Sequence, residues 1–275
     1  MRWFPGGRSG NLEDRRGRGM GGALGIGGGL VMLILGLIFG PEILSDGGDG
    51  IAGESYGEVG LSPADSAREE PMVLFVSHVL DDVQQTWSGA FQGAGAPYRP
   101  AKLVLFRDGT ESACGVGQSA MGPFYCPLDE KVYLDLGFFS ELDRRFGAPG
   151  DFAQAYVIAH ELGHHVQHLL GTDARVRELQ RGNPNIANQL SVRLELQADC
   201  YAGVWAHSAH DRGKLETGDI EEGLGAASAV GDDRIQRRTT GSVEVDSFTH
   251  GSAKQRAEWF NRGFESGNST SCDTF

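Results

Sequence analysis

The chain has 275 residues and a formal net charge of −13 at pH 7. An acidic excess of this size argues against nucleic acid and anionic lipid headgroups as partners. Hydrophobic residues make up 40% of the chain and charged residues 22%, which is ordinary for a globular protein with a substantial core. The length suits one or two domains.

The N-terminal part is predicted to anchor the chain in a membrane. Residues 20–40 hold no charged residue and are long enough to cross a bilayer, which takes about 20 helical residues. Five arginines precede this stretch, and acidic residues follow it. The positive-inside rule therefore predicts a single-pass protein, with residues 1–19 as a cytoplasmic tail, residues 20–40 as a transmembrane signal-anchor and the remainder outside the cytoplasm. A cleaved signal peptide is the alternative.

Residues 41–70 are rich in Gly, Ser, Asp and Glu, a composition typical of a flexible linker. One folded domain is then predicted over residues 71–275. Helical spacing of apolar residues and runs of β-branched and aromatic residues indicate its first elements. These are a helix over residues 73–92, strands over residues 102–106 and 131–136, and a short helix over residues 138–146.

Residues 151–170 read DFAQAYVIAHELGHHVQHLL and carry the most informative pattern in the chain. Apolar residues recur at helical spacing, and Asp151 is a candidate N-cap. His160 and His164 are separated by four residues, so they lie on one face of the helix and can bind one metal ion. Glu161 is turned about 100° around the helix axis. Its carboxylate is therefore predicted to act on a water molecule as a general base.

Residues 188–207 are predicted to form a second helix, because Ala, Leu and Glu are frequent there. Glu195 and Asp199 share one face of it. Zinc in hydrolytic sites takes three protein ligands and leaves a fourth position for water. Glu195 can complete the set begun by the two histidines, and Asp199 can accept a hydrogen bond from one of them and fix its tautomer. A solvated acidic helix face is the alternative.

Two further helices are predicted to begin near Thr217 and Ser252. Strands come first and helices follow, so the predicted class is α+β. His250 and Arg256 near the last helix allow two interpretations: an ordinary helix start with exposed charge, or two donors for the oxyanion of a tetrahedral intermediate. The other histidines examined are predicted to have structural roles; they are His78, His165, His168, His207 and His210.

Four cysteines in an exported domain suggest two disulfides. Cys114 and Cys126 flank a glycine-rich loop and are predicted to pair. Elimination then pairs Cys200 with Cys272, although four cysteines allow three connectivities. A cysteine zinc site is disfavoured because the sequence has no CxxC spacing.

The segments HELGHHVQHLLG, ELQADCYAG, GDDRIQ and SFTHGSAKQRAEWFNRGF together resemble the putative neutral zinc metallopeptidase family of bacteria, from about Pro71 to Cys272. The resemblance implies a zincin-like fold with a small N-terminal sheet, an active-site helix and a helical C-terminal part. It implies Glu195 as the third zinc ligand and Asp199 behind a ligand histidine. In the wider group of such proteins a proline follows the later histidine, whereas Gly251 follows His250 here.

The resemblance also implies that residues 132–136 form the strand that binds the substrate backbone, with an ordinary core strand as the alternative. The resulting hypothesis is a membrane-anchored, exported endopeptidase with one Zn²⁺ per chain, acting on peptides or unfolded proteins. Glu161 would be the general base, and His250 with Arg256 would stabilise the oxyanion. The rival hypothesis is a non-catalytic, membrane-tethered interaction protein on a zincin scaffold. The presence of Glu161 and all three ligands favours the enzyme.

Overall fold

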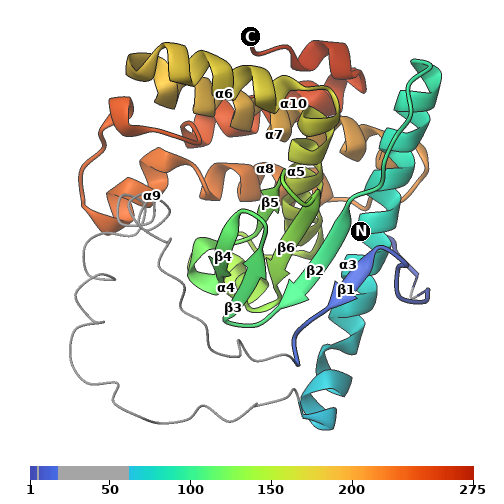
Figure 1. Ribbon diagram of the computed structural model, residues 1–275. Helices are drawn as coiled ribbons and strands as arrows, with labels where there is room; N and C mark the ends of the chain where they lie inside the picture. Colours follow the sequence, from blue (N-terminus) through green and yellow to red (C-terminus); the bar gives the residue numbers. More distant parts are fainter. Residues whose placement is uncertain (5, 18–61) are drawn as a thin grey trace.

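The computed structural model describes residues 1–4, 6–17 and 62–275 (Figure 1). The predicted signal-anchor over residues 20–40 and most of the predicted linker lie outside the described residues. Among the helices that are described, none combines the length and the apolar character needed to cross a membrane.

The described part is α+β, as predicted, with a small sheet below a larger set of helices (Figure 1). The main sheet has the strand order β1-β2-β6-β5, in which β5 alone is antiparallel to its neighbour. Its strands are β1 (Leu12–Asp14), β2 (Lys102–Phe106), β5 (Phe124–Cys126) and β6 (Lys131–Asp135), and a separate hairpin joins β3 (Gly109–Ser112) and β4 (Gly115–Gln118). The predictions of β2 and β6 are confirmed. The other four strands have three or four residues each, too few to show an alternating pattern.

Strand β6 is paired on both sides, with β2 through Val132 and Leu103 and with β5 through Val132 and Tyr125. The β5 pairing covers residues 131–133, so a peptide cannot join the sheet along that part of β6. The expectation that residues 132–136 form the substrate-binding strand is therefore wrong for Val132 and Tyr133, and Leu136 lies outside β6, at the start of α4. The free edge of the sheet on this side belongs to β5.

Residues 1–4 and 6–17 belong to the folded unit. Strand β1 pairs with β2, with Leu12 opposite Leu103. The Arg16 side chain is buried between two carboxylates, 2.7 Å from Asp14 and 2.7 Å from Glu69. A sequence pattern does not reveal such contacts, because the partners are far apart along the chain.

Helix α3 (Pro63–Gly93) begins ten residues before the predicted start, so residues 63–70 are helical and not linker. The Ser62 side chain caps this helix by accepting a hydrogen bond from the backbone N–H of Asp65. The ion pairs of Glu69 and Glu70 with the N-terminal segment support the same turns. Tertiary contacts thus stabilise helix where the composition suggested a linker.

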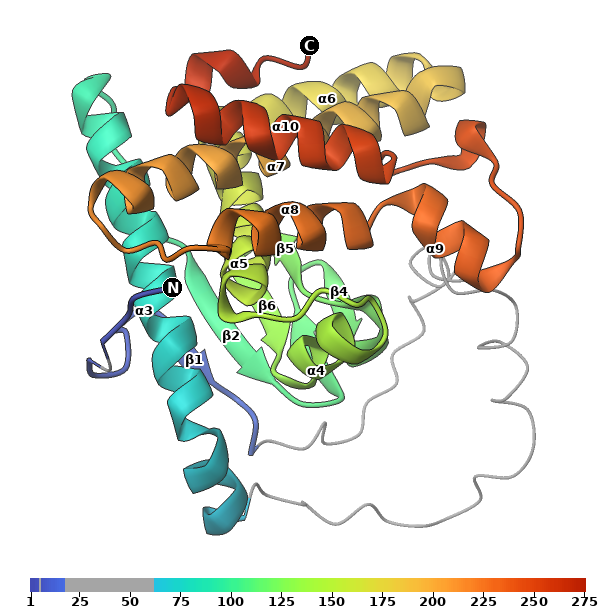
Figure 2. The same cartoon turned by 180° about the vertical axis from the view of Figure 1, so that it is seen from behind.

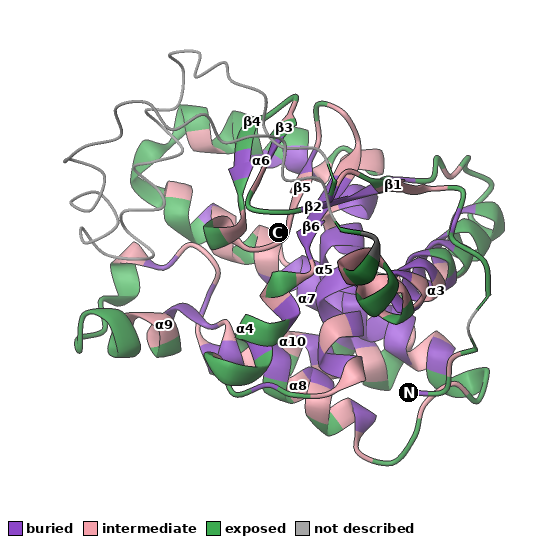
Figure 3. Ribbon diagram, turned by 90° about the horizontal axis from the view of Figure 1, so that it is seen from below, coloured by how far each residue is buried: buried purple, intermediate pink, exposed green. Residues whose placement is uncertain are grey.

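The remaining helices pack against the sheet and against one another, most of them on one side of the sheet (Figure 2). They are α4 (Gly137–Arg144), α5 (Asp151–Leu169), α6 (Thr172–Gly182), α7 (Ala187–Asp211), α8 (Asp219–Ala229), α9 (Asp232–Thr239) and α10 (Ala253–Ser266). Buried residues concentrate on α5, α7 and one face of α3, whereas α6, α9 and the β3–β4 hairpin are largely exposed (Figure 3). Helices α6 and α9 were not predicted, because their strongly polar sequences resemble loops.

Helices α7 and α10 pack in close contact because glycines face each other across the interface. A Cβ atom at Gly203 would lie 2.0 Å from the carbonyl oxygen of Phe260, and one at Gly263 would lie 1.9 Å from that of Cys200. Both predicted disulfides are present, Cys114–Cys126 and Cys200–Cys272. The second joins the C-terminal segment to α7 beside this interface.

Candidate metal centre

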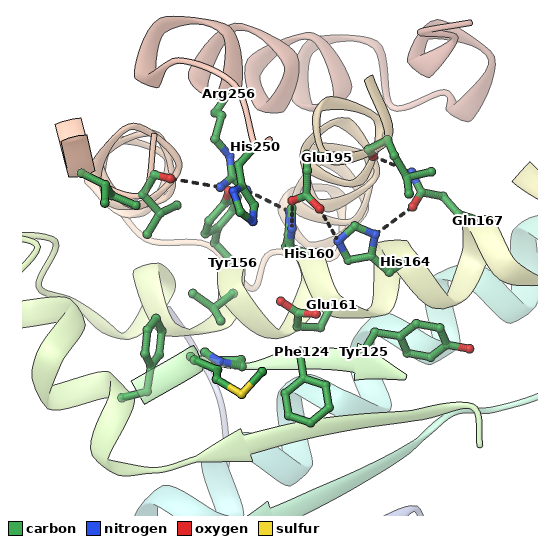
Figure 4. A pocket seen from close by; sticks show the side chains of 18 of the residues that line it. Phe124, Tyr125, Tyr156, His160, Glu161, His164, Gln167, Glu195, His250 and Arg256 are labelled. Atoms are coloured by element: carbon green, nitrogen blue, oxygen red, sulfur yellow. Dashed lines mark hydrogen bonds and ion pairs between the residues drawn. The ribbon is translucent and has the colours of Figure 1, made fainter. Parts of the chain in front are cut away.

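Helices α5 and α7 bring the three predicted ligands together (Figure 4). His160 Nε2 lies 3.2 Å from one carboxylate oxygen of Glu195, and His164 Nε2 lies 3.4 Å from the other. The three potential ligand atoms all lie within 4.8 Å of one another. The predicted helix of residues 151–170 is confirmed as α5, although its N-cap is Gly150 and Asp151 is its first residue.

These residues fit a zinc ion in geometry and in chemistry. Zinc–nitrogen and zinc–oxygen bonds are about 2.0–2.2 Å long, so the ligand atoms of a tetrahedral site lie roughly 3.3 Å apart. The separations of 3.2 and 3.4 Å, each measured to a different oxygen of Glu195, are close to that spacing. Two imidazole nitrogens and one carboxylate oxygen form a donor set that zinc accepts in catalytic sites.

The glycine inside the motif determines how closely the two ligand-bearing helices approach. A Cβ atom at Gly163 would lie 3.0 Å from the carbonyl oxygen and 3.2 Å from the Cα of Ala198. Even the Cβ of an alanine at this position would require the facing backbone of α7 to shift by a few tenths of an ångström. The glycine thus allows the third ligand to reach the other two.

Asp199 supports His160, as predicted. The carboxylate is completely buried and lies 2.8 Å from His160 Nδ1, which leaves Nε2 free to bind a metal. It also accepts hydrogen bonds from the Tyr156 hydroxyl at 2.5 Å and from the Arg256 guanidinium at 2.8 and 2.9 Å. Burial alone would raise the pKa of Asp199, but the charges of Arg256 and His160 outweigh it and lower the pKa.

Arg256 is itself buried and lies behind His160. Besides Asp199, its guanidinium donates to the hydroxyl of Tyr156 at 3.2 Å and to the carbonyl of Val230 at 3.3 Å. These partners differ from the oxyanion contact expected from the sequence. Tyr156 was missed because an aromatic residue four positions before a ligand histidine looks like an ordinary core residue.

His164 is supported by a chain of neutral amides that sequence reasoning also missed. Its Nδ1 lies 2.8 Å from Oε1 of Gln167. The Gln167 amide donates to the carbonyl of Leu194 at 2.7 Å and to Gln197 at 3.1 Å, and Gln197 donates to the carbonyl of Cys272 at 3.0 Å. The available signal was spacing, because Gln167 follows His164 by three residues and shares its helix face.

Glu161 faces the cavity between the ligands and Phe124 of β5 (Figure 4). Its side chain is buried, and burial raises its pKa even though the two neighbouring histidines lower it. Among the described residues, none hydrogen-bonds to this carboxylate. It is therefore available to a water molecule at the metal, as a general base must be.

His250 lines the same cavity, of about 470 Å³, and Asp232 holds it in place. One oxygen of Asp232 accepts the backbone N–H groups of Thr249, His250 and Gly251 at 2.8, 2.6 and 3.0 Å. The other oxygen lies 3.2 Å from His250 Nδ1. Burial lowers the pKa of His250, but this hydrogen bond and the charges of Glu195 and Asp232 together outweigh it, so the net shift is upward. Asp232 is the first aspartate of GDDRIQ, a segment for which no role was predicted.

Gly251 follows His250 because the backbone turns through a left-handed conformation there, with φ of 94°. A Cβ atom would also lie 3.2 Å from Val192 and 3.3 Å from Leu196. The difference from the proline of the wider group therefore has a local structural reason.

The other histidines lie outside the metal centre, as predicted. His165 lies 2.9 Å from the Tyr125 hydroxyl and donates to the carbonyl of Arg99 at 2.6 Å. His168 Nδ1 lies 2.9 Å from Asp173, and His207 donates to the carbonyl of Phe264.

Two histidines on α5, a carboxylate on α7 and a glutamate beside them without a hydrogen bond to any described residue are the features of the HExxH class of metal sites. Over residues 1–275 the chain matches the family described as putative neutral zinc metallopeptidase, and it belongs to that family. The family description implies zinc as the metal.

Its relatives are uncharacterized proteins. YpfJ of Escherichia coli (strain K12) is 48% identical over 284 aligned residues, covering 100% of this chain and 99% of that protein. Mb2605 of Mycobacterium bovis is 44% identical over 206 residues, covering 71% of this chain and 68% of that protein. No solved structure matches the chain.

Proposed function

We propose that this protein is a zinc-dependent endopeptidase with a zincin-like fold. The observation that carries the proposal is Glu161, a buried carboxylate that no described residue hydrogen-bonds and that faces the same cavity as the three proposed zinc ligands. A site for a purely structural metal would have no need of such a group, because structural zinc sites are closed by four ligands.

Zinc, when bound, would supply a Lewis acid and lower the pKa of a water molecule toward ~7. Glu161 would take a proton from the attacking water and later deliver it to the leaving amine. His250 in its protonated form would donate a hydrogen bond from Nε2 to the developing oxyanion, because its Nδ1–H is directed at Asp232 and its Nε2–H remains free. Arg256 would hold Asp199, and through it the ring of His160, instead of touching the oxyanion.

The substrate in this proposal is an extended peptide or an unfolded protein. Strand β5 forms the edge of the sheet next to α5, and an extended chain can add to such an edge through main-chain hydrogen bonds. Phe124 and Tyr125 of β5 line the cavity that also holds the proposed zinc ligands. Binding through the main chain would tolerate many side chains.

Two glutamine substitutions in the full chain test these roles. Glu161→Gln should retain zinc while cleavage of an unfolded protein falls by about 10²–10⁴-fold or more, the usual contribution of a positioned general base. Glu195→Gln should lower both zinc retention and cleavage. Zinc loss in Glu161→Gln together with full retention and activity in Glu195→Gln would refute the assignment, and absence of cleavage by the zinc-loaded wild type would refute the enzyme.

We further propose that the protein is exported and is attached to the membrane through residues 20–40. Two disulfides support export, because such bonds persist mainly in oxidising compartments. The β1–β2 pairing adds a constraint, because residues 1–17 and 62–275 share one compartment in the folded protein. A single crossing that leaves residues 1–19 in the cytoplasm would require β1 to leave the sheet.

Labelling of intact cells tests the side on which each end lies. Gly10→Cys and Glu265→Cys replace exposed residues, and a membrane-impermeant maleimide reaches only cysteines outside the cytoplasm. Labelling of both variants would support export with β1 in the sheet. Labelling of Glu265→Cys alone would support the single crossing, and labelling of neither would refute export.

A further inference from the structure

Five exposed arginines lie on α4 and α9 or directly next to them. Arg144 is the last residue of α4 and Arg145 follows it, whereas Arg234, Arg237 and Arg238 belong to α9. We call these five residues the basic surface. The chain as a whole carries a net charge of −13, so this local group of cations differs from the rest of the molecule.

Contacts around Phe146 place the two groups of arginines side by side. The Arg238 guanidinium donates to the backbone carbonyls of Arg145 and Phe146 at 3.0 and 3.2 Å. The guanidinium carbons of Arg145 and Arg238 each lie 5.8 Å from the centroid of the Phe146 ring. Arg234 precedes Arg238 by four residues and therefore shares its face of α9. The basic surface is thus continuous from one helix to the other.

Four of these arginines are not neutralised within the part of the chain that the structure describes. No described carboxylate forms an ion pair with Arg144, Arg234, Arg237 or Arg238. Guanidinium groups pair readily with carboxylates, often through two parallel hydrogen bonds. These four side chains are therefore suited to carboxylates supplied by another molecule.

Acidic residues next to the basic surface reduce its charge but do not cancel it. Asp232 and Asp233 begin α9, but Asp232 is buried, and Asp233 accepts a backbone N–H of α10 at 2.7 Å. Glu141 and Asp143 of α4 are exposed. The arginines outnumber the carboxylates that face solvent beside them.

The first turns of α9 join the basic surface to the metal centre. Asp232 lies 3.2 Å from His250 Nδ1, and Arg237 follows Asp232 by five residues, about 7.5 Å along the helix axis. Phe146, over which two of the arginines lie, also lines the cavity. His250 lies on the opposite side of the ligand set from Gln167 (Figure 4). The basic surface therefore lies at one end of the cavity, next to the proposed oxyanion donor.

We propose that the basic surface binds an acidic segment of the substrate a few residues away from the cleaved bond, on one side of that bond only. This inference rests on the proposed peptidase function and specifies its substrate class. An extended peptide advances about 3.3 Å per residue, so a residue roughly two to four positions from the bond would reach the arginines. The other end of the cavity has no such excess of charge, because Asp173 and Arg177 form an ion pair there at 2.9 Å.

Matched peptides test the preference on the zinc-loaded full chain. Cleavage sites in an unfolded protein are mapped first by mass spectrometry, and one of them supplies the core sequence. Three glutamates stand two to four positions before the bond in one peptide and two to four positions after it in another, and glutamines replace them in the reference peptides. One of the two acidic peptides should show a KM lower by at least about threefold with kcat little changed, because exposed ion pairs are individually weak and act here on binding.

The gain should disappear at about 1 M salt, where charges are screened beyond about 3 Å. Equal KM values for acidic and reference peptides, or the same gain on both sides of the bond, would overturn the inference while leaving the proposed peptidase intact. The result is diagnostic because the net charge of −13 by itself favours basic peptides over acidic ones.

Substitutions on α9 connect the preference to the basic surface. Arg234→Gln with Arg237→Gln should abolish it, and Arg234→Lys with Arg237→Lys should keep most of it, since the interaction depends on charge. Arg238 stays in place because it holds α9 to the end of α4. Arg175→Gln with Arg181→Gln on α6 is the matched control, because both arginines are exposed and neither lines the cavity. An unchanged preference in the glutamine double variant of α9, or the same loss in the control, would overturn the assignment.

A binding measurement tests the basic surface independently of turnover. A disordered peptide with three central glutamates and its glutamine counterpart are labelled with a fluorophore and titrated with Glu161→Gln, the variant expected to retain zinc. Binding of the acidic peptide that is at least about threefold tighter, and that is lost when Arg234→Gln and Arg237→Gln are added, would support the inference. Equal binding of the two peptides would overturn it even if the wild type is a peptidase, whereas selective binding without cleavage by the wild type would refute the peptidase alone.

Discussion

The two histidine ligands are held by different kinds of surroundings. His160 bonds to a fully buried carboxylate, Asp199, which is neutralised by Arg256. His164 bonds to Gln167, and its support then passes through neutral amides to backbone carbonyl groups. One metal site thus combines an ionic support with an uncharged one.

The difference predicts how strongly the surroundings of each histidine respond when one of their side chains is replaced. Removal of either partner of a buried ion pair is strongly destabilising, because the remaining charge is buried with neither water nor an opposite charge beside it. An amide that loses a neighbour leaves only an unpaired dipole, which costs about 1–3 kcal/mol. We therefore expect the His160 side to be fragile and strongly coupled, and the His164 side to change gradually on mutation.

The largest effect is expected from Arg256→Met, which breaks the ionic support. Asp199 would keep its buried charge without the guanidinium, and removal of one partner from such a pair costs about 3–5 kcal/mol in the free energy of unfolding. Denaturant titration of the full chain measures the loss. Arg262→Met on the same helix is the control, because Arg262 is exposed and only lies over Trp259, a contact worth about 0.5–1 kcal/mol. Equal losses in both variants would contradict the comparison.

Asp199→Asn comes next and removes the charge while keeping the shape. The His160 ring would lose its ionic partner, so zinc affinity should fall by about 10–100-fold, the usual result of altering the group behind a ligand. Competition with a chelator measures this. Asp173→Asn provides the control, because Asp173 bonds to His168, a histidine of the same chain region that is not a ligand. A similar fall in that variant would show a general charge effect.

Gln167→Met should lower zinc affinity by about tenfold, the small end of the same range. The substitution leaves Nδ1 of His164 without its acceptor but leaves no charge uncompensated. The same chelator competition applies, and the free energy of unfolding should change less than in Arg256→Met. A loss of zinc larger than that of Asp199→Asn would mean that the neutral side is the more sensitive one.

The smallest change is expected from Gln197→Met, one step farther from the metal. Gln197 contacts Gln167 rather than a ligand, and Gln167 keeps its bond to the carbonyl of Leu194 in this variant. Zinc affinity should therefore fall by less than in Gln167→Met. An effect equal to that of Gln167→Met would indicate that the amides act as one unit, as the ionic side does.

The sequence predicted the ionic support better than the neutral one. Spacing on two helices predicted that His160 and His164 share one face and that Glu195 and Asp199 share another, and these side chains do lie together in the structure. Gln167 has a comparable helical spacing from His164, but the prediction did not consider an uncharged side chain as a hydrogen-bond partner of a ligand histidine. The contact of Asp232 with His250 could not be predicted from spacing, because it depends on the fold, which brings α9 beside the turn before α10.

Long-range pairing limited the prediction of the fold in the same way. The β2 and β6 segments were recognised from their own composition, but the strand that binds the outer edge of β2 lies about 90 residues earlier in the chain. Strand β5 has three residues, so its position at the edge, and with it the correction to the substrate strand, follows from the sheet order alone.

The pairing of β1 with β2 has a consequence for laboratory work on this protein. A recombinant chain shortened to the helical and catalytic part, starting near Ser62, would lose the strand that pairs with Leu103 and Leu105 and one of the two arginines that pair with Glu69. The exposed strand would then offer free N–H and C=O groups to other molecules, a common route to aggregation. Production of a soluble, monodisperse sample therefore calls for the first 17 residues, supplied in the same chain or added as a separate peptide.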